Sequence, residues 1–368
     1  MIRFVLSPTL GYLLLLMSVL LTFVVFDREV ITTNNYLEYY ILLVTIIFFV
    51  ITLAIQTKFK FNNFKLRDVR PYAINNMVFV IIIANISEYF ILGVPLLSTD
   101  VSYHTFGLPY VHHISVSSWL LLFAIRLTNR KIFNVFLLLF ALLNPIFMQN
   151  RDILLLTVYV GVVLLTINNK LSFFKLFLIA FSILLLFGKL GMIRSPLGLE
   201  LALESLPLSI EYDTESILFP FYWFLIYFTG SIFNSLYLMA GNYIIYYENI
   251  NAISEFMGWY RDVGFFGFIA FEASLLSILI ISLMLATKNS KFLAIYVYLN
   301  FQVIMTLFSK KVFLTNTLFT IAFILIFYLL WFFSRKRSNI FSTSLFVRSV
   351  SMLNDFKNKA IQLFKDKP

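Results

Sequence analysis

The sequence predicts an all-α polytopic integral membrane protein, and three observations lead to this fold class. Hydrophobic residues make up 61% of the 368 residues and charged residues 12%, whereas soluble domains are nearer half apolar and a quarter charged. The mean hydropathy is +0.91. The chain also contains 44 Phe and 20 Tyr, and burying that much aromatic surface requires lipid or a very large core.

Apolar runs of about 17–25 residues, the length of a helix that crosses a bilayer, recur along the chain. The first run, 4–26, is too long for the apolar core of a signal peptide and lacks a small-residue cleavage site after it, so we interpret it as a retained span. A further apolar segment, 218–240, would invert the topology of every later span, and we interpret it as a re-entrant or interfacial helix. The predicted membrane spans, about ten in number, are 4–26, 39–56, 77–97, 111–127, 132–148, 152–168, 173–193, 264–286, 292–309 and 312–333.

The distribution of Lys and Arg predicts the orientation of these spans. Most of the 28 basic residues fall in connections on one side, which is the cytoplasmic side by the positive-inside rule. Residues 335–368 contain eight Lys or Arg and two Asp, with apolar residues at three-to-four spacing. This pattern predicts a cytoplasmic amphipathic C-terminal helix on membrane lipids and no nucleic-acid partner. We therefore predict a transmembrane domain, 1–334, with a large outer loop, 194–263, and a basic cytoplasmic tail, 335–368.

The connection 85–113 is the stretch richest in candidate functional residues. It places Glu88 inside an apolar span, roughly 13 Å from the outer end of that span at 1.5 Å per residue. A carboxylate inside a span is costly and indicates a functional site, although a hydrogen-bonded packing residue is the alternative. His112 opens the next predicted span, where it is either a proton shuttle or a half-wet interfacial histidine. We expect Glu88 or His112 to accept a proton from a hydroxyl group or to orient the residue that does.

A second group of candidates consists of basic residues on the predicted outer side, where Lys and Arg are normally depleted. Arg151 is the most informative of them, because it lies where a predicted span begins. A guanidinium beside the free N–H groups of a helix N-terminus suits a phosphate group. The alternatives are an ion pair with the neighbouring Asp152, snorkelling for Arg194, and an ion pair with Asp262 for Arg261. The whole group comprises Arg28, Arg151, Lys189, Arg194, Arg261, Lys310 and Lys311.

Metal chemistry is not predicted. The chain has no cysteine, which excludes disulfides, thiolate metal sites and thiolate nucleophiles. The acidic run 211–215 in the predicted outer loop contains carboxylates of the kind that hard divalent cations prefer. Short acidic runs in loops are mostly solvated, so we interpret this run as a polar surface and expect neither a metal nor another cofactor.

Several of these residues stand in an order that resembles the Wzy-type oligosaccharide repeat-unit polymerases. The resemblance covers roughly residues 85–285, which is most of the region of predicted spans. The positions that carry it are Glu88, Gly93 and Pro95 in GVPLL, Tyr103, Gly107 and Pro109 in FGLP, His112, Arg151 in NRDILL, Tyr227, Thr229, Gly230 and Asn234 in YFTGSIFN, and Tyr260, Arg261, Asp262, Gly264 and Gly267 in WYRDVGFFG.

This resemblance implies a glycosyltransferase of O-antigen or capsular polysaccharide biosynthesis, without a metal. Such an enzyme joins repeat units carried on undecaprenyl diphosphate at the outer face of the bacterial plasma (inner) membrane. Its partners are the lipid-linked glycan donor and acceptor, together with a chain-length regulator protein. The alternatives are a glycan ligase that uses the same donor and a lipid-linked glycan flippase or other transporter.

The chemistry of this reaction assigns roles to the candidate residues. Negative charge develops on the departing lipid diphosphate, so preorganised cations are the main requirement. We expect Glu88, His112 and Arg151 to be catalytic. Arg151, Arg194, Arg261 and Lys310 would bind the diphosphate. The expected sugar-binding or structural residues are Tyr103, Gly107, Pro109, Tyr227, Tyr260 and Asp262.

Overall fold

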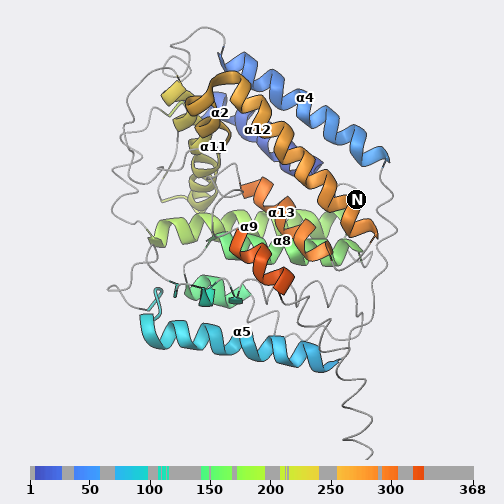
Figure 1. Cartoon of the computed structure of the whole chain (residues 1–368). Helices are drawn as coiled ribbons and strands as arrows, with labels where there is room; N and C mark the ends of the chain where they lie inside the picture. Colours follow the sequence, from blue (N-terminus) through green and yellow to red (C-terminus); the bar gives the residue numbers. More distant parts are fainter. Residues whose placement is uncertain are drawn as a thin grey trace, which may run out of the picture. The chain divides into compact units, whose positions relative to one another are not determined.

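A computed structural model shows the protein as an assembly of helices (Figure 1). Regular structure in the described residues is helical, apart from an isolated β-bridge between Phe26 and Leu208, and the all-α prediction is confirmed for this part of the chain. The chain divides into two units, Met1–Ile321 and Ala322–Pro368. The described residues are 5–26, 37–58, 71–97, 107–108, 110–112, 114–115, 142–148, 151–167, 172–194, 208–211, 213, 215–239, 255–288, 292–305 and 318–326.

The main helices coincide with predicted apolar runs. They are α2 (Thr9–Val25), α4 (Leu37–Lys58), α5 (Pro71–Leu92), α8 (Arg151–Ile167), α9 (Phe173–Arg194), α11 (Phe219–Met239), α12 (Glu255–Lys288) and α13 (Leu293–Met305). Within the described residues, three stretches are long and apolar enough to cross a membrane: Tyr39–Lys58, Phe174–Ile193 and Val263–Lys288. These helices are compatible with a membrane protein, while the predicted number of about ten spans stays a prediction.

The helix α13 forms the core of the first unit. All of its residues except Ile304 are buried, and it contacts α2, α8 and α12. Gly11 of α2 allows a close approach, since a Cβ atom there would lie 3.2 Å from Cγ1 of Val303. A small residue at such a contact brings two helix backbones together, which is how helices pack where lipid replaces water.

The helices α9 and α11 make an even closer contact. A Cβ atom on Gly188 would lie 1.9 Å from the carbonyl oxygen of Pro220, so only glycine fits between these two backbones. The Phe187 ring packs on Phe224 and Tyr227, each with 5.5 Å between ring centroids. The segment predicted as a re-entrant or interfacial helix is thus one uninterrupted helix packed on α9, and its relation to the membrane stays a prediction.

Two glycines determine where apolar helices end or bend. Gly264 has φ 74° and ψ −166°, a conformation open almost only to glycine, and it breaks α12 at the first residue of the predicted span 264–286. Gly93 has φ 82° and follows the end of α5 at Leu92. The helix α5 begins at Pro71, before the predicted span 77–97, and the positive φ of Gly93 ends it at Leu92. The prediction that the span continues as a helix to residue 97 was therefore wrong.

Candidate functional site

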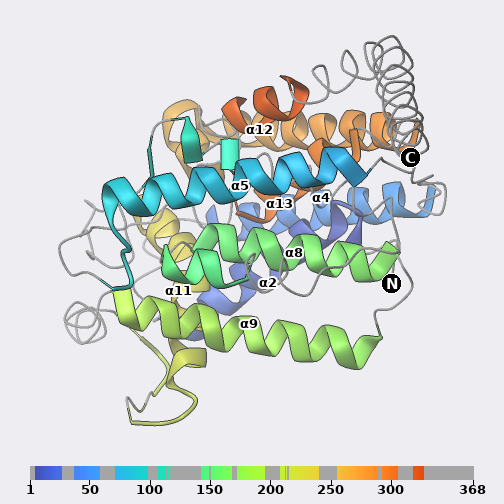
Figure 2. The same ribbon diagram turned by 90° about the horizontal axis from the view of Figure 1, so that it is seen from below.

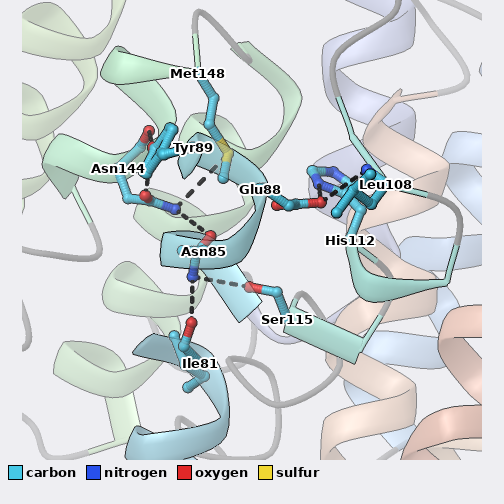
Figure 3. Close-up of polar contacts among 9 residues, drawn as sticks. All are labelled: Ile81, Asn85, Glu88, Tyr89, Leu108, His112, Ser115, Asn144 and Met148. Carbon is cyan, nitrogen blue, oxygen red and sulfur yellow. Dashed lines mark hydrogen bonds and ion pairs between the residues drawn. The ribbon is translucent and has the colours of Figure 1, made fainter. Parts of the chain in front are cut away.

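Glu88 lies in the last turn of α5, and three separate segments surround it (Figure 3). These segments are the end of α5 itself, residues 107–115 and residues 142–148. From Glu88 to the last helical residue, Leu92, is only about 6 Å at 1.5 Å per residue. The expected depth of roughly 13 Å was therefore wrong, since it assumed that the helix continued beyond Gly93.

The Glu88 side chain is buried and pairs with a histidine. Its Oε1 atom accepts a hydrogen bond from the backbone N–H of Leu108 at 3.2 Å and lies 3.4 Å from Nδ1 of His112. The Glu88 side chain is 0% exposed, whereas the His112 side chain is 20% exposed. Among the described residues, no hydrogen-bond partner contacts the second oxygen, Oε2. Within the part of the chain that the structure describes, the carboxylate thus has one engaged oxygen and one oxygen without a donor.

A tight turn brings His112 to the carboxylate. Gly107 has φ 124° and Tyr110 has φ 66°, both outside the regions that most residues adopt. The backbone N–H of His112 donates to the carbonyl of Leu108 at 3.2 Å, which closes the turn. A Cβ atom on Gly107 would lie 3.4 Å from Cγ of His112. Glycine therefore allows both the unusual φ and the close approach of the imidazole.

A second polar network lies beside this pair. Nδ2 of Asn144 donates to Oδ1 of Asn85 at 3.0 Å, and the Tyr89 hydroxyl donates to Oδ1 of Asn144 at 2.6 Å and to its carbonyl at 3.2 Å. Nδ2 of Asn85 donates to Oγ of Ser115 at 3.0 Å. Asn85, Glu88 and Tyr89 are three and four residues apart on α5, so they share one face of the helix.

Sequence reasoning found Glu88 and His112 and missed this network. The available signal was Asn85, a polar amide inside an apolar run and one helical turn before Tyr89. Asn144 and Ser115 gave no comparable signal, because their partners come from other segments. The structure thus brings Glu88 and His112 together, and adds Asn85, Tyr89 and Asn144 as neighbours (Figure 3).

The predicted cations lie at helix ends or outside the described residues. Arg151 is the first residue of α8, Arg194 is the last residue of α9, and Arg261 precedes the bend of α12 at Gly264. The structure describes their backbone positions and not their side chains. The same holds for Tyr260 and Asp262. Six further residues of the connection and of the outer side lie outside the described residues: Tyr103, Pro109, Lys310, Arg28, His113 and Lys311.

Two of the helix ends that carry these arginines lie on the same side of the first unit. The helices α8 and α9 are consecutive and contact each other, and Figure 2 shows that α8 begins where α9 ends, on the side where α5 ends. Figure 1 shows that α12 begins at the edge of the first unit opposite α5. Arg151 follows Met148 by three positions, so the two Cα atoms lie within about 11 Å of each other. The start of α8 therefore lies close to the segment 142–148 that contacts α5, while a shared site for all three arginines stays a prediction.

The described geometry brings one carboxylate and one imidazole together near the end of α5. A carboxylate and an imidazole 3.4 Å apart can accept a proton from a hydroxyl group and hold it. Searches of protein-family models, curated proteins and solved structures find no match.

Proposed function

We propose that this protein is a glycosyltransferase that polymerises oligosaccharide repeat units carried on undecaprenyl diphosphate. The observation that carries the proposal is the buried Glu88 carboxylate, paired with His112 in the last turn of α5. An ionisable group enclosed among apolar helices is costly and is kept where it serves chemistry or transport. The part-exposed imidazole gives this carboxylate a route to a substrate hydroxyl.

The proposed reaction forms one glycosidic bond for each repeat added. A sugar hydroxyl oxygen of the acceptor attacks the anomeric carbon of the donor, and its proton passes to the Glu88–His112 pair. The bond between the anomeric carbon and the diphosphate oxygen breaks, and its electron pair leaves with undecaprenyl diphosphate. Because the Glu88 side chain is fully buried and the His112 side chain is 20% exposed, the imidazole would meet the acceptor hydroxyl, and Oε1 of Glu88, 3.4 Å from Nδ1, would stabilise the charge that the imidazole gains.

Cations would stabilise the departing diphosphate. Arg151 at the N-terminus of α8 combines a guanidinium with free backbone N–H groups. Arg194 and Arg261, with Lys310 in reserve, would complete the clamp, and the position of the α9 end beside the start of α8 supports this assignment for Arg194 (Figure 2). Preorganised positive charge of this kind is the largest requirement of the reaction, because the leaving group gains negative charge in the transition state.

The remaining predicted residues would bind sugars or shape the site. Gly107 shapes the turn that holds His112. Tyr227 packs on Phe187 of α9, which favours a structural role for its ring over a sugar platform. Tyr103, Pro109, Tyr260 and Asp262 stay candidates for sugar contacts. The proposed location is the outer face of the bacterial plasma membrane, with a periplasmic or extracellular active site and about ten spans.

Deletion of the gene tests the proposal against its two rivals. Loss of a polymerase leaves surface glycan with a single repeat on its anchor, whereas loss of a ligase or a flippase leaves none. Gel analysis of the surface glycan separates these outcomes. The lipid-linked repeat is then extracted from the deletion strain and added to vesicles that contain the purified protein. This transport assay measures whether the protein extends the glycan chain or only moves the lipid-linked repeat across the membrane. Transport without extended product would overturn the polymerase proposal.

Arg151→Ala tests the clamp within the same strain. We expect single repeats to persist and long chains to disappear, because the diphosphate loses its helix-end cation. Lys189→Ala is the matched control, since Lys189 is an exposed cation on α9 with no role in the proposed reaction. A normal chain-length ladder with Arg151→Ala would contradict the clamp.

A further inference from the structure

We infer that Asn144 is a positioning residue that fixes the start of α8, and with it Arg151, relative to the Glu88 carboxylate. The inference rests on the proposed function, because it concerns the spacing between the proposed base and the proposed diphosphate clamp. Asn144 itself touches neither Glu88 nor a proposed substrate group. It acts through the segment 142–148, which joins α5 to the N-terminus of α8.

Asn144 is buried, and both the oxygen and the nitrogen of its side-chain amide form hydrogen bonds. Oδ1 accepts from the Tyr89 hydroxyl at 2.6 Å, and Nδ2 donates to Oδ1 of Asn85 at 3.0 Å. The Asn144 carbonyl accepts from the same Tyr89 hydroxyl at 3.2 Å. Nδ2 also lies 3.8 Å from Sδ of Met148. These directional contacts define both the position and the rotation of the side chain, as Figure 3 shows.

The residues that hold Asn144 belong to the helical turn that carries Glu88. Asn85 precedes Glu88 by three residues and Tyr89 follows it directly, so any shift of Asn144 along α5 breaks bonds on either side of the carboxylate. A second contact pins the other end of the segment. The backbone N–H of Leu96, in the turn that follows α5, donates to the carbonyl of Phe147 at 3.1 Å. The segment 142–148 is thereby held at two points, one on α5 and one on the turn after it.

The position of the segment 142–148 limits where Arg151 can lie. Only three positions lead from Met148 to Arg151, a reach of about 11 Å at full extension. The start of α8 therefore cannot move far from the Asn144 contact without breaking it. An apolar contact at this place would hold the helices together but would let them slide, whereas amide hydrogen bonds specify one register.

Ligand binding by the purified full-length chain in nanodiscs tests the inference. The probes are undecaprenyl diphosphate and, as the lipid-only control, undecaprenol. We expect Asn144→Leu to weaken binding of undecaprenyl diphosphate roughly tenfold and to leave undecaprenol binding unchanged, because coupling between residues that act on one site is of this size. A loss of both affinities would indicate a merely structural role and would overturn the inference.

A triple variant separates positioning from folding. Asn85→Leu, Tyr89→Phe and Asn144→Leu together replace the three mutually bonded side chains by apolar groups. Among the described polar side chains, only the Ser115 hydroxyl then loses a buried partner, so most of the stability recovers. The inference expects the diphosphate-specific loss to persist in the triple variant. Full recovery of diphosphate binding in a folded triple variant would show that Asn144→Leu acted only through unsatisfied polar groups, and would overturn the inference.

A double-mutant cycle with Arg151→Ala tests whether Asn144 acts through Arg151. If Asn144 positions Arg151, the double variant binds undecaprenyl diphosphate no more weakly than Arg151→Ala alone. Additive losses would show that Asn144 acts elsewhere. The wild-type protein tests the proposed function separately. If it binds undecaprenyl diphosphate and undecaprenol with equal affinity, both the proposed clamp and this inference are wrong. If it prefers undecaprenyl diphosphate and Asn144→Leu keeps that preference, only the inference is wrong.

Discussion

The protein contains two buried carboxylates in apolar helices, and their surroundings differ. Glu272 of α12 accepts a hydrogen bond from the Tyr12 hydroxyl of α2 at 2.9 Å, between two helices that both pack on α13. Glu88 of α5 contacts a backbone N–H and a histidine that is 20% exposed. One partner of Glu272 is the buried phenol of Tyr12, whereas the partner of Glu88 is an imidazole that is part exposed. Burial of a carboxylate is therefore not sufficient to indicate a catalytic site. The side chain that pairs with the carboxylate, and the exposure of that side chain, distinguish the two positions.

The surroundings of α13 extend this contrast. The carbonyls of residues 5–7, just before α2, accept hydrogen bonds from the side chains of Tyr159, Tyr296 and Asn300. Asn300 also donates to the Tyr159 hydroxyl at 2.7 Å. Backbone carbonyls outside a helix need such partners where water is excluded. Polar groups in this region satisfy the backbone and connect helices, while Glu88 contacts a part-exposed imidazole.

The largest expected difference between the two regions is in activity. Glu88→Gln keeps the size and the acceptor for the Leu108 N–H but cannot take up a proton, and we expect chain elongation to fall by about 100-fold or more. Glu272→Gln keeps the acceptor for the Tyr12 hydroxyl, and we expect its elongation rate to stay within about twofold of wild type. Elongation of the extracted lipid-linked repeat by purified protein measures both. Equal losses in the two variants would erase the proposed distinction.

The sequence indicated the region around Glu88 for a physical reason, whereas it did not indicate most of the polar contacts around Glu272 and α13. Glu88 stands out because a carboxylate in an apolar run is costly wherever it lies. Its depth was wrong because a helix end depends on Gly93, whose positive φ does not follow from the apolar pattern. Tyr12, Tyr159 and Asn300 gave no signal, since tyrosines and amides occur in many apolar helices and only packing determines their partners.

The second expected effect is on stability at Glu272. Tyr12→Phe keeps the ring that stacks on Phe48 at 6.0 Å but removes the hydroxyl that donates to Glu272. Losing the donor to a buried carboxyl group should lower the free energy of unfolding by about 1–3 kcal/mol, with unchanged elongation per folded molecule. Thermal unfolding in detergent measures this loss. Tyr40→Phe, at an exposed tyrosine, is the control and should leave the unfolding temperature unchanged.

A smaller effect should accompany Gly107→Ala, which strains the turn at His112. Alanine is disfavoured at φ 124°, and its Cβ would lie 3.4 Å from Cγ of His112. We expect the free energy of unfolding to fall by about 1–2 kcal/mol and elongation to fall with it, because the imidazole shifts from Glu88. Gly161→Ala on α8 is the control, since no atom lies within 4 Å of the added Cβ. If Gly107→Ala lowered stability and kept full elongation, the turn would not position the catalytic pair.

The smallest effect should come from Tyr159→Phe in the region around α13. This change removes the hydroxyl that donates to the Val5 carbonyl at 3.4 Å and accepts from Asn300 at 2.7 Å. Both bonds join neutral groups, so we expect the free energy of unfolding to fall by only about 0.5–1.5 kcal/mol. The chain-length ladder should not change, because these contacts hold backbone and not substrate. Denaturation curves and glycan gels from the same cells test both halves, and a shortened ladder at unchanged stability would assign the α13 region a direct part in polymerisation.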